Sequence, residues 1–158
     1  MKRVARCIRP VILVVVAAAG AVGCSRPQPE TYAPGLGEIM TLQQMRHSKL
    51  FFAGQASNWD LAAYELKELQ EGFDDVVKYP PTHENAPLPI SQLVPNMMNG
   101  PIKELGDIIA AKDRGRFPAA YDALTKACNG CHEAANFGFN VVERPSQNPY
   151  TNQVFQPK

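Results

Sequence analysis

Helical periodicity is the feature that most narrows the folds available to this 158-residue chain. Between residues 38 and 136, apolar residues recur at intervals of three and four, the spacing of one face of an α-helix. The clearest run comprises Trp59, Ala62, Leu66, Leu69, Phe73 and Val76. Similar patterns cover residues 38–53, 91–113 and 117–136, and the sequence has no alternating run long enough for a β-strand. The pattern therefore predicts an all-α chain with four amphipathic helices.

Local signals predict where these helices begin, end and bend. Ser57-Asn58-Trp59-Asp60 offers a capping start to the second helix, and Tyr79-Pro80-Pro81 ends it. Asn99-Gly100-Pro101 is expected to kink or split the third helix, because proline removes a helical hydrogen bond. Four helices joined by short loops predict an antiparallel four-helix bundle over residues 38–137. Residues 138–158 are predicted to form an irregular, extended C-terminal tail.

The pentapeptide Cys128-Asn129-Gly130-Cys131-His132 lies near the end of the fourth helical pattern and matches C-x-x-C-H, the attachment pattern of a c-type haem. On a helical turn, the three-residue offset puts both sulfurs on one side, where they can reach two vinyl groups on one porphyrin edge. The histidine that follows can then bind the iron. Cys128 and Cys131 are therefore candidate thioether residues, and His132 is the candidate proximal ligand of one covalent haem c.

Two other interpretations of the cysteine pair were weighed against haem. A redox dithiol usually opens a helix after a strand, whereas here residues 117–127 before the pair form a helical pattern. A zinc site needs two further ligands. The remaining histidines, His47 and His83, belong to no second paired ligand motif. Haem attachment is therefore the favoured interpretation.

The N-terminus is typical of an exported bacterial protein. A basic start is followed by a 13-residue apolar run over residues 11–23, which describes a secretory signal and is shorter than the roughly 20 residues of a membrane span. The run ends in Ala21-Val22-Gly23-Cys24, which resembles the lipobox of bacterial lipoproteins. Residues 1–23 are thus predicted to be a lipoprotein-type signal peptide, with Cys24 lipid-modified. An ordinary cleaved signal is the alternative. Residues 24–37, rich in proline and glycine, are expected to form a tether.

Export and haem attachment support each other, because c-type haem is attached outside the cytoplasmic membrane. Cys7 would leave with the signal, so no thiol remains for a structural disulfide. Cleavage before Cys24 also removes four of the 16 Lys and Arg residues, leaving a net charge of −3 that argues against nucleic acid as a partner. We therefore expect a protein on the periplasmic side, held to a bacterial membrane by a lipid anchor.

A single C-x-x-C-H in the last helix of a predicted four-helix bundle resembles the cytochrome c-prime family and its low-spin relatives. The resemblance covers about residues 38–137 and implies that a first-helix residue faces the distal side of the iron; it also permits a homodimer. Family members typically end soon after the motif, whereas 26 residues follow His132 here. This tail either folds back over the haem edge through Tyr150 and Phe155 or forms a flexible terminus.

Helical geometry ranks the candidates for the distal ligand. With about 100° per residue, one arc of the first helix carries no charged side chain. It holds Ile39, Met40, Gln43, His47, Leu50, Phe51 and Gly54. His47 lies near the middle of the arc and is the first choice, with Met40 the runner-up. A histidine that is only hydrogen-bonded at a helix seam is the alternative for His47.

Three functions are compatible with these features. The favoured one is a monohaem cytochrome that carries single electrons between redox partner proteins. The second is a gas-binding protein for nitric oxide or carbon monoxide, like the high-spin members of the family. The third is an accessory haem subunit of a respiratory complex. The sequence holds no second constellation of catalytic residues, so we do not expect an enzyme.

Overall fold

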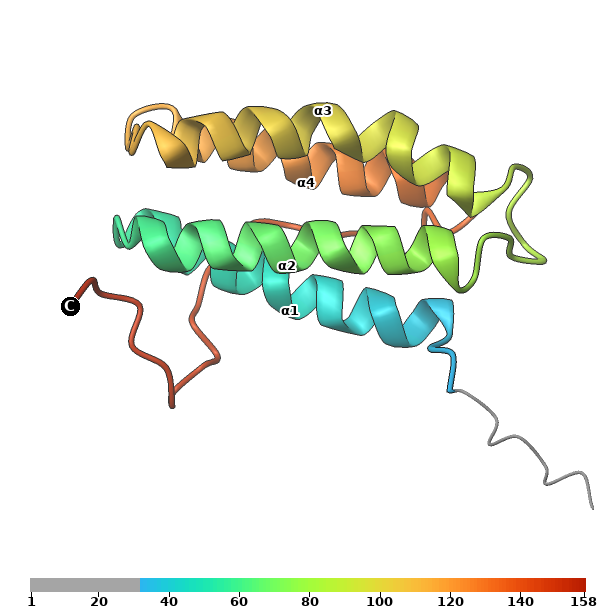
Figure 1. Cartoon of the computed structure of the whole chain (residues 1–158), viewed down its shortest axis with the longest axis horizontal. Helices are drawn as coiled ribbons and strands as arrows, with labels where there is room; N and C mark the ends of the chain where they lie inside the picture. Colours follow the sequence, from blue (N-terminus) through green and yellow to red (C-terminus); the bar gives the residue numbers. More distant parts are fainter. Residues whose placement is uncertain (1–31) are drawn as a thin grey trace, which may run out of the picture. The chain divides into compact units, whose positions relative to one another are not determined.

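The computed structural model describes residues 32–158, which contain four α-helices joined by short loops (Figure 1). They are α1 (Leu36–Gln55), α2 (Trp59–Lys78), α3 (Ile90–Ala110) and α4 (Phe117–Ala134). Consecutive helices run in opposite directions, with α1 packed on α2, α2 on α3 and α3 on α4. The prediction of an all-α chain with four helices is confirmed, and residues 32–158 contain no β-strand.

Parts of the predicted N-terminal organisation fall outside this range. The signal peptide (1–23), the lipidation candidate Cys24 and residues 24–31 of the tether lie outside the described residues. Helix α1 begins at Leu36, inside the stretch predicted as tether. The helical region therefore starts two residues earlier than the sequence pattern indicated.

Helix α2 begins as predicted, and α3 is a single helix. The Asn58 side chain accepts a hydrogen bond of 3.2 Å from the backbone N–H of Leu61, which caps α2. Helix α3 continues through Pro95 and Pro101, so of the two outcomes expected at Asn99-Gly100-Pro101, a kink or a split, the split does not occur. Burial of its apolar face offsets the lost backbone hydrogen bonds, since packing supplies most helix stability in proteins. The side chains that form this face are Ile90, Leu93, Val94, Met98, Ile102, Leu105, Ile108 and Ile109.

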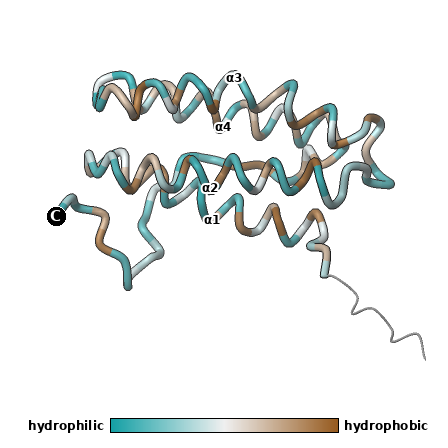
Figure 2. Tube along the Cα trace, in the orientation of Figure 1, coloured by the Kyte–Doolittle hydropathy of each residue, from teal (hydrophilic) through white to brown (hydrophobic). Residues whose placement is uncertain are grey.

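The core is formed by the apolar stripes of all four helices, visible as brown segments that recur between teal ones (Figure 2). Helices α1 and α4 approach each other closely at few positions. One such position is Gly54 of α1, where the ring of Phe117 lies directly on the helix backbone. A β-carbon on Gly54 would lie 2.0 Å from Cζ of Phe117. The absence of a side chain at residue 54 therefore lets this end of the α1–α4 seam close.

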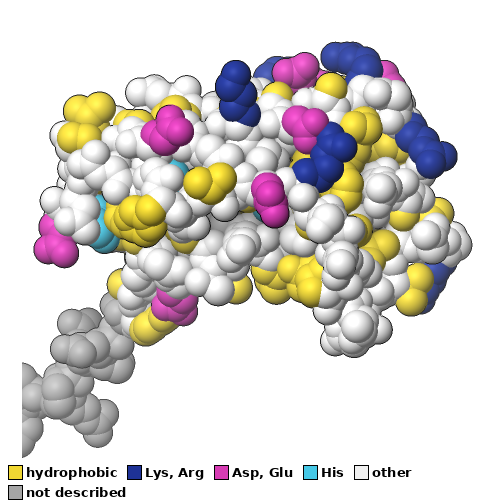
Figure 3. Space-filling model, turned by 180° about the vertical axis from the view of Figure 1, so that it is seen from behind, with side chains coloured by type: hydrophobic (Ala, Val, Ile, Leu, Met, Phe, Trp, Pro, Cys, Tyr) yellow, Lys and Arg dark blue, Asp and Glu magenta, His cyan; other side chains and the backbone are white. Residues whose placement is uncertain are grey.

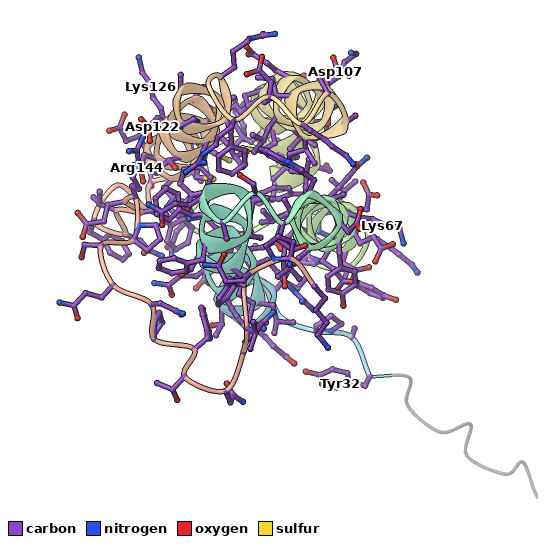
Figure 4. All side chains as sticks on the ribbon, turned by 90° about the vertical axis from the view of Figure 1, so that its left-hand side faces the viewer. Tyr32, Lys67, Asp107, Asp122, Lys126 and Arg144 are labelled. Atoms are coloured by element: carbon purple, nitrogen blue, oxygen red, sulfur yellow. The ribbon has the colours of Figure 1, made fainter. Side chains whose placement is uncertain are left out.

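Residues 138–158 form no helix or strand, yet they pack along the bundle (Figure 1). The guanidinium of Arg144 pairs with Asp122 of α4 and lies 5.6 Å from the ring centroid of Phe51 of α1. Figure 4 shows Arg144 beside Asp122. Farther along, Phe155 is buried, and its ring centroid lies 5.6 Å from that of Phe52. The tail thus covers the side of the bundle where α1 and α4 meet.

Gly54→Ala tests whether this close approach is required. The added methyl group has no room against Phe117, so we expect the free energy of unfolding to fall by about 2–3 kcal/mol. Gly100→Ala in α3 is the matched control, because nothing lies within 4 Å of its β-carbon position. There we expect a gain of roughly 0.5–1 kcal/mol from helix propensity. Urea unfolding measures both, and equal effects of the two substitutions would contradict this account of the seam.

Candidate functional site

A mainly apolar cleft of about 190 Å³ lies between the first half of α1 and the last turns of α4. Its walls are Gly37, Met40, Thr41, Gln43, Gln44 and His47 of α1, Leu69 and Phe73 of α2, Val94 and Met98 of α3, Cys128, Cys131 and His132 of α4, and Asn140 and Val142 of the tail. A second cavity of about 180 Å³ shares six of these residues and extends toward His83 and Phe137. All three residues of the predicted haem motif therefore line one two-lobed cleft.

Both thiols of the motif are free and partly buried. Burial raises the pKa of Cys128 to about 12 and also raises the pKa of Cys131. Reactive redox dithiols have lowered thiol pKa values, so these cysteines do not resemble such a pair. Within residues 32–158, no cluster of three or more His, Cys, Asp and Glu side chains is arranged to hold a metal ion. The surroundings of both sulfurs are instead suited to an apolar group.

His132 is held in one tautomer by the tail. Its Nδ1 lies 2.6 Å from the backbone oxygen of Asn140. A carbonyl oxygen can only accept, so Nδ1 carries the proton and donates it to Asn140. In the neutral ring this tautomer leaves the lone pair on Nε2, the form in which an imidazole binds iron or another metal. The structure thus gives the predicted proximal ligand a free donor atom beside the two thiols.

His47 lies in a buried hydrogen-bond network and is 4% exposed. The Thr125 hydroxyl donates to the backbone oxygen of Tyr121, so Thr125 Oγ1 accepts from Nε2–H of His47 at 2.8 Å. In the neutral ring Nδ1 then accepts from the Tyr121 hydroxyl at 2.9 Å, and this hydroxyl also lies 3.0 Å from the His47 backbone oxygen. Both ring nitrogens of His47 are therefore engaged within the protein. In this arrangement the imidazole has no free lone pair for a metal.

The register of α1 against α4 places Met40, not His47, at the level of His132. The helices are antiparallel, and His47 faces Thr125. Met40 lies seven residues before His47 on α1, and His132 lies seven residues after Thr125 on α4. The same register holds deeper in the bundle, where Phe51 meets Tyr121 and Gly54 meets Phe117. At 1.5 Å per residue, His47 is about 10 Å along the helix axis from the level of Met40.

Other residues are placed differently from the sequence-based expectations. Tyr150 and Phe155 pack on α1 away from the cleft, and Asn140 and Val142 are the tail residues that line it. His83, which sequence reasoning assigned to no ligand motif, is half-buried against Phe137 with ring centroids 5.1 Å apart. Its place in a proline-rich loop gave no periodic signal. Figure 3 shows histidine surfaces (cyan) next to hydrophobic side chains (yellow) at the left of the view.

Comparisons with known proteins give no relative for this chain. No family model matches it, and neither a curated protein nor a solved structure is similar to it. Among the helices of residues 32–158, none has the length and apolar character needed to cross a membrane. The arguments about function therefore rest on the residues and their geometry.

The buried state of His47 predicts a specific pH dependence of stability. Burial lowers the pKa of His47 to about 4, below its value of about 6.5 in the unfolded chain. Because the unfolded chain binds more protons between these values, the contribution of neutral His47 is complete above pH 6.5 and is lost as the pH falls toward 4. At roughly 1.4 kcal/mol per pKa unit, the loss between pH 7 and 4.5 is about 2 kcal/mol.

Urea unfolding of the wild-type chain and of His47→Gln at both pH values measures this contribution. The variant has no imidazole to titrate, so its stability should change less between pH 7 and 4.5. The same loss in both proteins would show that His47 does not titrate as its burial requires.

Proposed function

We propose that this chain is a monohaem c-type cytochrome that transfers single electrons between partner proteins. The observation that carries the proposal is the joint position of Cys128, Cys131 and His132 in one cleft, with the His132 Nδ1–H held by a backbone carbonyl. The thiols form the two thioether bonds, and Nε2 of His132 is the proximal ligand. The bound haem would supply a one-electron couple between ferric and ferrous iron.

The residues around the motif fit such a group. Leu69, Phe73, Val94 and Met98 provide apolar walls from α2 and α3. The α1 and α4 backbones approach closely at few positions, and at this end of the seam a cleft separates them. The bundle therefore offers a mainly apolar, partly enclosed space beside the two sulfurs. An apolar shell of this kind would limit water access to a bound haem and tune its redox potential.

We further propose Met40 as the first-helix residue on the distal side, in place of the initially favoured His47. Met40 lines both lobes of the cleft together with His132, and the α1–α4 register sets it at the same level. Within residues 32–158 no hydrogen bond competes for the thioether of Met40, whereas both nitrogens of His47 have partners. Methionine ligation raises the potential above that of a bis-histidine site.

Gas binding is the second candidate function, and the same geometry supports it. With His47 engaged by Tyr121 and Thr125, the side chain of α1 opposite His132 is the uncharged Met40. If the Met40 sulfur does not bond the iron, the distal side is an apolar space that admits nitric oxide or carbon monoxide. The ligation state of Met40 therefore separates the two functions.

Export and membrane attachment form a separate part of the proposal. The basic and apolar segments of residues 1–23, followed by Cys24, support a periplasm-facing protein with a lipid anchor. Attachment of c-type haem takes place in that compartment, which is consistent with the motif. Mass spectrometry of the mature N-terminus tests this part independently of the haem site.

Covalent haem attachment is the first test of the proposed function. The wild-type chain, produced in a host that matures c-type cytochromes, should carry one haem that stays bound on a denaturing gel. Cys128→Ala and Cys131→Ala should each remove one thioether bond, and the double variant should lose the covalent haem. A wild-type protein that acquires no haem under these conditions would refute the proposal.

Absorption spectra of the ferric and ferrous protein then test Met40. We expect a six-coordinate, low-spin wild type with the charge-transfer band of a methionine–iron bond. Met40→Ala should be high-spin, bind carbon monoxide faster and have a lower reduction potential. Met45→Ala, on α1 but outside the cleft, is the matched control and should keep the wild-type spectrum. A wild type that is five-coordinate in both oxidation states would favour gas binding instead, and a bis-histidine spectrum that Met40→Ala leaves unchanged would assign the sixth ligand to His47.

A further inference from the structure

The side-chain amide of Asn129, inside the C-x-x-C-H motif, forms two hydrogen bonds with the backbone of Val142 in the tail. Its Nδ2–H donates to the backbone oxygen of Val142 at 2.8 Å. In return, the backbone N–H of Val142 donates to Oδ1 of Asn129 at 2.7 Å. A single amide thus satisfies both backbone groups of Val142, much as a neighbouring β-strand would. We call this pair of hydrogen bonds the Asn129 clasp.

The clasp lies next to the hydrogen bond that orients His132. Asn129 and His132 are three residues apart on α4, so they are neighbours on one face of the helix. Their partners, Val142 and Asn140, are two residues apart on the extended tail and both line the cleft. Val141 between them is 71% exposed, as expected for an alternating chain. The clasp therefore sets the register in which the Asn140 carbonyl meets the imidazole.

We propose that Asn129 is a positioning residue that tunes the proximal ligand through the tail. This inference rests on the proposed function, because it concerns His132 as an iron ligand. A carbonyl held against Nδ1–H makes the imidazole a more basic ligand. A more basic ligand stabilises ferric over ferrous iron, which lowers the reduction potential. Asn129 acts on the iron only by fixing where the Asn140 oxygen lies.

Two backbone hydrogen bonds precede the clasp: Phe137 N–H donates to the His132 oxygen at 2.7 Å, and Asn140 N–H donates to the Phe137 oxygen at 2.8 Å. They form the turn that brings Asn140 back to α4, and the clasp holds the chain that continues beyond it. Arg144 pairs with Asp122, but both side chains are largely exposed, and surface ion pairs contribute little to stability. Tyr150 and Phe155 pack on α1, eight or more residues beyond Val142. Of the tail contacts, the Asn129 clasp and the His132 bond are the ones that lie beside the thioether cysteines. The clasp is thus the contact that holds the Asn140 carbonyl toward His132 from the far side of that turn.

The test compares haem-loaded wild type with Asn129→Ala and Asn129→Leu, using Arg144→Gln as a control that loosens the tail elsewhere. Alanine and leucine both favour helix more than asparagine does, so α4 is not weakened by either substitution. In both Asn129 variants we expect a higher reduction potential. We also expect amide hydrogen exchange at Val142 to be at least about tenfold faster, as for loss of a protecting hydrogen bond. Arg144→Gln should leave both quantities at their wild-type values.

Each other outcome contradicts the inference in a recognisable way. An unchanged potential in both Asn129 variants, with haem attached, overturns it and leaves the proposed function intact. An equal shift in Arg144→Gln also overturns it, because general loosening of the tail would then explain the effect. Fast exchange at Val142 in the wild type shows that the clasp does not form. A wild type without covalent haem overturns both proposals, whatever the protection of Val142.

Discussion

The hydrogen bonds of His47 to Thr125 and Tyr121 fix how α1 and α4 are paired. These groups are buried, and a buried polar group without a partner is costly. A slip of one turn between the helices would leave the imidazole and the Tyr121 hydroxyl unpaired. Apolar packing alone tolerates such shifts better, because hydrophobic contacts are non-directional. The network therefore specifies one register, and the position of the cleft follows from it.

Helix α1 carries a second polar seam on the side that meets α2. Arg46, next to His47, lies 3.2 Å from the carboxylate of Glu65, which is only 1% exposed. Gln43 donates to the backbone oxygen of Leu69 at 2.7 Å. Neighbouring residues on a helix point about 100° apart, so Arg46 contacts α2 whereas His47 contacts α4. Polar contacts on both sides thus hold α1 between α2 and α4. Charges such as Lys67 and Asp107 point outward instead (Figure 4).

The sequence was sufficient to predict features that arise within a single helix. Periodicity predicted four helices, and the spacing of Cys128, Cys131 and His132 predicted side chains that line a common cleft. The sequence did not show which of Met40 and His47 lies at the level of His132, because the seven residues between them make nearly two whole turns. The two side chains then share an arc, and a helical wheel says nothing about position along the axis. That information came from the partner helix.

Contacts made by the loops and the tail could not be predicted from the sequence either. His83 and the pairing of Asn129 with Val142 involve loop and tail backbone that no periodic pattern describes. The sequence left open whether α3 kinks or splits at Pro101 for a related reason, since burial of its apolar face overrides local propensity. In each case the deciding interaction joins residues that are distant in the sequence or depends on tertiary packing.

Side chains of the tail point alternately toward and away from the cleft. This alternation constrains the number of residues between the motif and Asn140 more than it constrains which residues they are. Asn140 and Val142 face the cleft, whereas Phe139 and Val141 are 83% and 71% exposed. Substitutions at the outward positions leave the inward row untouched. An insertion or deletion of one residue between His132 and Asn140 would instead exchange the two rows, turning Phe139 or Val141 inward. Related chains that keep this arrangement should therefore vary freely in the outward side chains and conserve the spacing from the motif.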